Sequence, residues 1–152
     1  HKLLYGISGE VPEGDYTIPF GVADIKRKGR DVTMVSMGRM VHVALEAAEK
    51  LSKNGVDLEV IDLRSLSPMD SKTILESVRK THRLVVVDED NPRCSMACDI
   101  IALVSTRAFD DLDAPPRMVT APHTPVPFSP PLEDYYIPSV EKIISTVKSL
   151  IR

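Results

Sequence analysis

Residues 32–63, VTMVSMGRMVHVALEAAEKLSKNGVDLEVIDL, contain a strand, a helix and a second strand in succession. The runs at 32–36 and 58–63 are short and apolar, which is typical of buried strands. Between them, apolar residues recur every three or four positions and predict one buried helix face over 39–53. These residues are Met40, Ala44, Ala47, Ala48 and Leu51. The stretch therefore predicts two strands joined by a helix, the repeating unit of an α/β sheet.

The same alternation continues to the C-terminus. Residues 84–87, LVVV, form an unbroken apolar run, which favours a strand covered on both faces of a sheet. Further helices are predicted from about residue 67, over 94–108 and from Ser139. A last strand is predicted over 117–120, between the second and the third of these helices. The proline-rich segment 121–131 is predicted to contain no regular structure.

The N-terminal side supplies an edge strand and a lead-in. Residues 21–26 alternate between apolar and polar side chains, and the short turn at 28–31 predicts that they pair antiparallel with 32–36. Residues 1–20, rich in Pro, Gly and acidic side chains, are predicted to be an extended lead-in to a domain at 21–152. The whole pattern predicts a three-layer α/β/α domain with about five strands, mostly parallel, and one antiparallel edge strand.

Composition excludes two classes of partner. The 152 residues carry 19 basic and 22 acidic side chains, a formal net charge of −3. A nucleic-acid-binding domain normally shows a basic excess, so we expect no nucleic-acid partner. The longest apolar runs fall far short of the roughly 20 residues that a membrane-spanning helix needs, so we expect no membrane partner. Cys94 and Cys98, the only cysteines, are predicted to be buried thiols on one helix face in a reducing cytoplasm.

Candidate binding residues follow the predicted strands, because ligands of open α/β sheets gather at the carboxyl ends of the strands. Ser36, Gly38 and Arg39 form a short loop entering a helix, a geometry able to hold an anion. The loop lacks a glycine-rich phosphate motif, so a structural turn is favoured. His123 follows the last strand in the proline-rich loop, where a functional and a structural role both stay open. These four residues are a candidate strand-end pocket.

Complete catalytic or metal-binding sets are not visible. The acidic residues 88–90 offer oxygen ligands to a hard cation, but the rest of a coordination set is missing. A solvated surface, or a face for a basic partner, is favoured there. No serine lies in a GxSxG motif, and neither cysteine has an evident partner base. The sequence predicts no catalytic residue, no cofactor ligand and no metal ligand in this chain.

A series of segments nevertheless resembles one known family. They are residues 35–41, 44–48, 60–70, 77–81, 112–115, 132–134 and 137–139, in order along almost the whole chain. This succession is similar to the C-terminal domain of the transketolase superfamily, and more closely to the beta subunits of 2-oxo acid dehydrogenase first components. Residues 87–95 and 120–130 look most like the acetoin dehydrogenase branch. The alternatives are a pyruvate or branched-chain 2-oxo acid dehydrogenase, or a stand-alone α/β ligand-binding module.

The resemblance implies an enzyme component that cleaves acetoin and passes the acyl unit to lipoamide. It implies that an N-terminal pyrimidine-binding domain precedes the lead-in, which fits a chain that begins at His1 rather than Met. Thiamine diphosphate and Mg²⁺ are implied in the full complex, bound by other domains, so we expect this domain alone to bind neither and to be inactive. The implied partners are the alpha subunit and a second beta subunit in an α2β2 heterotetramer, and a lipoyl-bearing acyltransferase.

The same resemblance implies a docking role for two positions. In pyruvate-type relatives, an acidic residue at the position of Asp113 and the C-terminus contact basic side chains of the acyltransferase. Asp113 matches that pattern, whereas the chain ends in Arg152, whose positive side chain departs from it. Charge complementarity of this kind sets specificity and encounter rate more than affinity.

Overall fold

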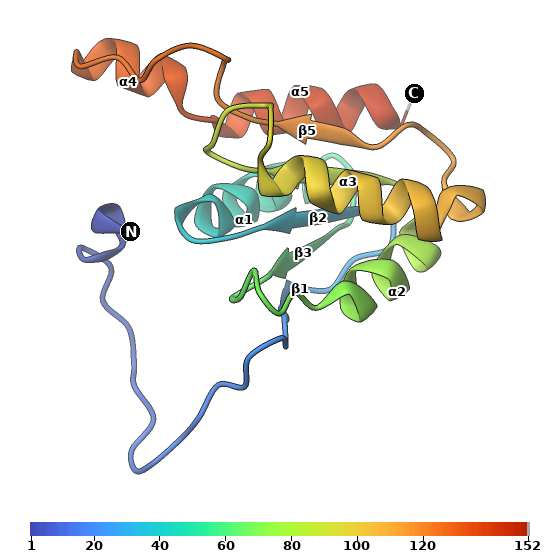
Figure 1. The fold of residues 1–152 in the computed structure, drawn as a ribbon, viewed down its shortest axis with the longest axis horizontal. Helices are drawn as coiled ribbons and strands as arrows, with labels where there is room; N and C mark the ends of the chain where they lie inside the picture. The colour runs from blue at the N-terminus through green and yellow to red at the C-terminus, as the bar shows by residue number, and fades with distance from the viewer. Residues whose placement is uncertain (152) are drawn as a thin grey trace.

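In the computed structural model, which describes residues 1–151, five strands form one sheet in the order β1-β3-β2-β4-β5 (Figure 1). The strands are β1 (Asp24–Arg27), β2 (Val32–Ser36), β3 (Leu58–Asp62), β4 (Leu84–Val87) and β5 (Arg117–Val119). β2 is parallel to β3 and β4, β4 is parallel to β5, and β1 is antiparallel to β3. The mostly parallel sheet with one antiparallel edge strand is confirmed.

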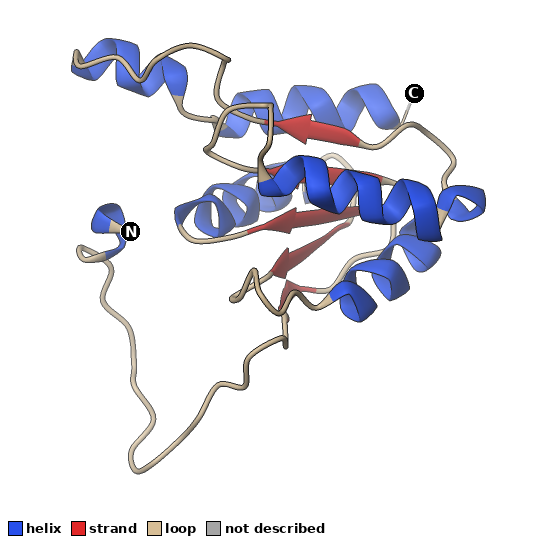
Figure 2. Ribbon diagram, viewed as in Figure 1, coloured by secondary structure: helices blue, strands red, loops and turns tan. Residues whose placement is uncertain are grey.

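Helices cover both faces of this sheet and complete three layers (Figure 2). They are α1 (Arg39–Ser52), α2 (Ser71–Thr81), α3 (Met96–Arg107), α4 (Pro130–Tyr136) and α5 (Val140–Leu150), with short 3-10 turns η1 (Lys2–Leu4) and η2 (Phe109–Asp111). Among the described residues, no helix is long and apolar enough to cross a membrane.

Two buried clusters lie on opposite sides of the sheet and explain its apolar strands. α1 and α5 contribute to one cluster, and α2 and α3 contribute to the other. Successive side chains of a strand point to opposite faces. Val85 therefore joins the α1 side and Val86 joins the α2 side. Each residue of β4 is buried in one of the two clusters, so the strand has no position for a polar side chain.

The pairing predicted for the edge strand is wrong. β1 pairs with β3 instead of β2, because the loop that connects β1 to β2 crosses over the start of β3. In that loop the backbone N–H groups of Arg30 and Asp31 both donate to the carbonyl oxygen of Asp57, at 3.1 and 2.9 Å. Gly29 lies so close to β3 that an added Cβ would be 2.1 Å from the carbonyl carbon of Leu58.

The start of α2 also differs from the prediction. Pro68 is not in its first turn, and the Ser67–Pro68 peptide bond is cis. The helix begins at Ser71 because the Asp70 carboxylate accepts a hydrogen bond from the N–H of Thr73 at 3.0 Å and so caps it.

The prediction for the two cysteines is wrong as well. α3 begins at Met96, so Cys94 lies before the helix, with a positive φ of 54° and an exposed side chain. Cys98 is on the helix but only half-buried, and its Sγ is 3.2 Å from the carbonyl oxygen of Pro92. The buried face of α3 is formed by Ala97, Ile100 and Val104. The cysteines therefore lie outside the core.

In the proline-rich segment, residues 121–129 contain no helix or strand, as predicted. Pro130 and Pro131 depart from the prediction because they form the first turn of α4. The first N–H groups of a helix have no partner within the helix, so proline is tolerated there. α4 buries none of its residues and stands off from the rest of the molecule (Figure 1).

Candidate functional site

The parallel strands end at one edge of the sheet, and the predicted residues lie along it. Ser36 ends β2 as a fully buried residue, and its hydroxyl donates to the carbonyl oxygen of Val87 at 3.0 Å. That bond ties β2 to β4 and leaves Ser36 inside the sheet. Gly38 caps α1 at φ 55°, where a glycine is required because other residues rarely adopt this conformation. Both residues shape the turn between strand and helix.

Arg39, the first residue of α1, lines a cavity of about 310 Å³ between this helix and the connection from α4 to α5. The positive charge of Arg39 also interacts electrostatically with the carboxylate of Glu89, a residue that follows β4. Burial raises the pKa of the Glu89 carboxyl, and the Arg39 guanidinium opposes this effect only in part. His1 contacts the same carboxylate, with Nε2 2.8 Å from Oε1. The result is a small charged cluster at the end of β4.

His123 lies in a different cavity, of about 380 Å³, with Asp90, Asn91 and Tyr136. The hydroxyl of Tyr136 donates to the carbonyl oxygen of Thr124 at 3.3 Å and closes one side of this hollow. The structure thus brings His123 next to the end of β4, but Arg39 lines the other cavity. The candidate pocket is divided between two hollows and a buried turn.

The acidic run at 88–90 has a structural role at its first position. The two carboxylate oxygens of Asp88 accept hydrogen bonds from the backbone N–H groups of Asp90, at 3.1 Å, and Ala97, at 3.4 Å. Asp88 therefore anchors the loop and the start of α3. Within residues 1–151, no group of three or more His, Cys, Asp or Glu side chains is placed to hold a metal ion.

Asp113 lies on another part of the surface, near the end of α5. Its Oδ2 is 3.3 Å from Nη2 of Arg83, and its backbone N–H donates to the carbonyl oxygen of His82 at 2.9 Å. The Nε of Arg83 donates to the carbonyl oxygen of Leu150 at 3.2 Å. Arg83 therefore holds Asp113 beside the C-terminal end of α5. Arg152, the second predicted docking residue, lies outside the described residues.

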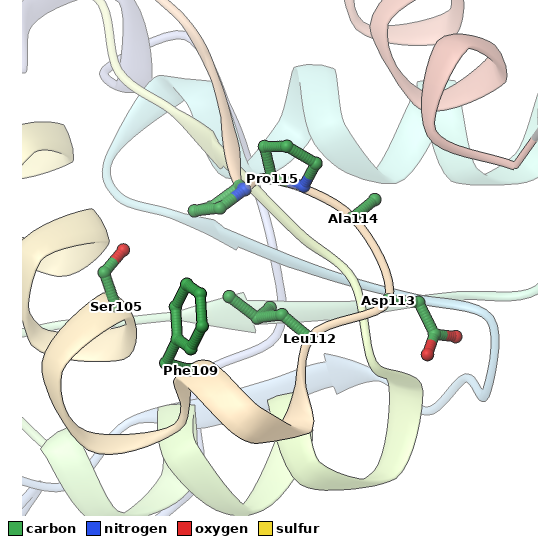
Figure 3. Close-up of a pocket in the computed structure, with 7 residues that line it drawn as sticks. Ser105, Phe109, Leu112, Asp113, Ala114 and Pro115 are labelled. Atoms are coloured by element: carbon green, nitrogen blue, oxygen red, sulfur yellow. The ribbon is translucent and has the colours of Figure 1, made fainter.

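A third cavity, of about 300 Å³, lies beside Asp113. Figure 3 shows Phe109, Leu112 and Pro115 around this hollow, with the Asp113 carboxylate turned away from it. Sequence reasoning identified neither Phe109 nor Arg83. An aromatic residue beside two acids in a helix-to-strand connection was a usable signal for Phe109. Nothing local marks Arg83, because its partners are distant in the sequence.

Comparisons with known proteins agree with this architecture. The family model for the transketolase C-terminal domain matches residues 21–143. The acetoin:2,6-dichlorophenolindophenol oxidoreductase subunit beta of Bacillus subtilis is 57% identical over 150 residues, which cover 99% of this chain and 44% of that protein. The protein of the same name in Cupriavidus necator is 57% identical over 152 residues, 100% of this chain and 45% of that protein.

A pyruvate-type relative is less similar over the same length. The pyruvate dehydrogenase E1 component subunit beta of Bacillus subtilis is 41% identical over 150 residues, 99% of this chain and 46% of that protein. Among solved structures, a split-gene transketolase in an inactive beta4 tetramer superposes with a TM-score of 0.79 at 26% identity, covering 94% of this chain and 46% of that chain.

The chain spans about half the length of the curated relatives that it matches. The part that matches includes every strand of the sheet and most of the helices that cover it. The matched range, the order of the strands and the likeness to the transketolase structure all lead to one assignment. This chain belongs to the transketolase C-terminal domain family.

Proposed function

We propose that this chain is the C-terminal domain of the beta subunit of a thiamine-diphosphate-dependent dehydrogenase component that cleaves acetoin and passes the acyl unit to lipoamide. The observation that carries the proposal is the ranking of the relatives. The two acetoin-type beta subunits are more similar to this chain than the pyruvate-type subunit, over practically the same length. The alternatives are a pyruvate or a branched-chain 2-oxo acid dehydrogenase, and the test must separate these enzymes by their substrates.

The proposed cofactor belongs to other parts of such a complex. A bound Mg²⁺ requires several oxygen ligands around one point. In the described residues the strand-end carboxylate that is most buried, Asp88, is already used by two backbone donors. These residues do not fit thiamine diphosphate with Mg²⁺, and we assign no chemical step to them. We propose that the alpha subunit and the part of such beta subunits that this chain does not cover bind the cofactor.

Assembly is the role proposed for this domain itself. Its proposed partners are the alpha subunit and a second beta subunit in an α2β2 heterotetramer, together with the lipoyl-bearing acyltransferase. The free cysteines fit a reducing cytoplasm, where we place the complex.

For the acyltransferase, the support is the surface around Asp113. A half-exposed carboxylate lies there beside the end of α5, held by Arg83. We propose that basic side chains of the acyltransferase pair with Asp113, and that Arg152, which lies outside the described residues, is the second docking residue.

The test compares substrates in the complete component. The full-length beta subunit would be purified with its alpha subunit, thiamine diphosphate and Mg²⁺, and reduction of 2,6-dichlorophenolindophenol would be followed with acetoin, pyruvate or 2-oxoisovalerate. We expect acetoin to give the highest kcat/KM, and the chain of 152 residues alone to be inactive. A higher kcat/KM with either 2-oxo acid would transfer the assignment to that branch. Tight binding of thiamine diphosphate by the isolated chain would contradict the role given to this domain.

A further inference from the structure

His82 is the exposed first residue of the short connection between α2 and β4. It ends α2 in the left-handed conformation, with φ 60° and ψ 8°, and its backbone N–H donates to the carbonyl oxygen of Val78 at 2.7 Å. Glycine is the residue most often found at this position of a helix end, and asparagine is the next choice. The backbone alone therefore gives no reason for an imidazole here.

The imidazole of His82 contacts the segment that follows α3. Its Nδ1 is 2.8 Å from the carbonyl oxygen of Asp111. A carbonyl oxygen can only accept, so Nδ1 carries the hydrogen of this bond. The carbonyl oxygen of His82 in turn accepts a hydrogen bond from the backbone N–H of Asp113 at 2.9 Å. A single residue therefore holds the chain on both sides of Leu112.

These two hydrogen bonds set the directions of the side chains in residues 111–113. Leu112 is half-buried and packs against the core cluster to which α2 and α3 contribute. Figure 3 shows Leu112 beside Phe109 at the hollow, while the carboxylate of Asp113 points away from it. Rotation of the backbone between the two bonds would turn that carboxylate, so the bonds determine where it points.

The connection that holds this segment is itself fixed to the centre of the sheet. The carbonyl oxygen of Arg83, next to His82, accepts a hydrogen bond from the N–H of Thr33 at 2.8 Å. Thr33 lies on β2 and is fully buried, as is Leu84, the first residue of β4. The His82 side chain thus projects from backbone that is anchored on one side by α2 and on the other by the sheet. A functional group is held most precisely when its support is rigid in this way.

Two ion pairs lie beside the hydrogen bonds of His82. Nε of Arg79 is 3.3 Å from Oδ2 of Asp111, and Nη2 of Arg83 is 3.3 Å from Oδ2 of Asp113. All four of these side chains are partly exposed, and ion pairs in such surroundings contribute little. The bonds that His82 makes act instead on the backbone of the segment, which is what gives the Asp113 carboxylate its direction.

We propose that His82 is a positioning residue for docking of the acyltransferase, and that its two hydrogen bonds hold the Asp113 carboxylate toward that partner. This inference rests on the proposed function, which pairs Asp113 with basic side chains, and adds the residue that directs the carboxylate. His82 acts only through Asp113. A carboxylate that is oriented in advance loses less conformational entropy on binding.

Two variants separate the side chain of His82 from its backbone. His82→Gly retains the left-handed conformation and removes the Nδ1 donor. His82→Asn tolerates the same conformation, and its side-chain amide nitrogen takes the place of Nδ1. In the full-length beta subunit with its alpha subunit, His82→Gly should raise the Kd for the acyltransferase at least about threefold, because one orienting hydrogen bond is lost. His82→Asn should bring the Kd back to within about twofold of the wild type.

Stability and a double variant give readouts that a merely structural role would not produce. The Tm of His82→Gly should stay close to that of the wild type, because glycine relieves the left-handed conformation while the exposed bond is lost. In an Asp113→Ala background, His82→Gly should have no further effect on the Kd, since the two residues act as one unit. The control is His42→Ala, which removes an exposed imidazole from α1 and should leave the Kd unchanged.

Four outcomes would overturn the inference while Asp113→Ala still weakens docking. They are an unchanged Kd in His82→Gly, no recovery in His82→Asn, a full additional loss in the Asp113→Ala background, and an equal loss in His42→Ala. In the wild type, ¹⁵N NMR of the neutral imidazole should show hydrogen on Nδ1, and hydrogen on Nε2 would also overturn it. Unchanged acyltransferase binding in Asp113→Ala would instead overturn the docking role in the proposed function, and this inference with it.

Discussion

Asp70 connects the segment before β1 to the start of α2 through a single carboxylate. It accepts hydrogen bonds from the N–H of Ala23 at 2.9 Å and of Thr73 at 3.0 Å, and from the hydroxyl of Thr73 at 2.7 Å. We expect Asp70→Ala to lower the free energy of unfolding by about 1–2 kcal/mol, since a lost helix cap alone costs about 1 kcal/mol. Urea unfolding, followed by circular dichroism, measures this free energy for the wild type and the variant. Asp70→Asn, which still caps, should cost less, and equal losses would contradict this role.

The same carboxylate predicts a dependence on pH. Burial alone would raise the pKa of Asp70, but the hydrogen bonds from Thr73 and Ala23 outweigh it and hold the pKa below its usual 3.8. A depressed pKa in the folded state gives stability that is present above the unfolded value and lost as pH falls through the folded value. The stability difference between wild type and Asp70→Asn should therefore shrink below about pH 4. A difference that stays constant from pH 7 to pH 3 would refute it.

Glu59 is a buried acid that serves the fold. Its side chain on β3 is 1% exposed and accepts hydrogen bonds from the hydroxyl of Ser77 at 2.6 Å and from the ammonium of Lys80. Glu59→Gln should lower the free energy of unfolding by about 1.5–3 kcal/mol, because a hydrogen bond between charged groups is lost. The control is Glu49→Gln on the exposed side of α1, where we expect no measurable change in urea.

Among the elements, the loop between β1 and β2 decides which strands pair. Gly29 passes within contact distance of the β3 backbone, and a Cβ there would be 2.1 Å from an atom of Leu58 and 2.3 Å from an atom of Glu59. Gly29→Ala should therefore cost about 2–3 kcal/mol or more, as expected for overpacking against backbone that cannot move aside. Thermal unfolding of this variant beside Gly9→Ala, which has no atom within 4 Å, measures the effect. Similar Tm values for the two variants would show that the loop can move.

In the whole molecule, Asp113 lies on a different part of the surface from the cavities that Arg39 and His123 line. The side chain is 55% exposed and pairs with Arg83, an interaction worth at most about 1 kcal/mol at such a site. We expect Asp113→Ala to weaken binding of the proposed acyltransferase while the Tm changes little. Calorimetric titration of the full component with the acyltransferase is the measurement, with Asp110→Ala as the control. A large loss of Tm with unchanged binding would make Asp113 a structural residue.

The sequence by itself determined the order and the type of most elements. β2, α1, β3 and β4 were predictable because burial imposes a period that is visible within a few neighbouring residues. The resemblance of the whole chain to one family was equally a property of the sequence, and the family match confirms it. Local patterns were less reliable at the ends of elements. There, single side chains such as Asp70 set the boundary of a helix.

Only the tertiary structure decided which distant residues meet. The edge strand pairs with β3 because Gly29 lets the loop cross its backbone, and no pattern within residues 21–36 carries that information. Arg39 and His123 line separate cavities, while Arg83 links Asp113 to the end of α5. Such contacts depend on how the layers pack in three dimensions. Periodicity reports which face of an element is buried, but not which residue of another element lies against it.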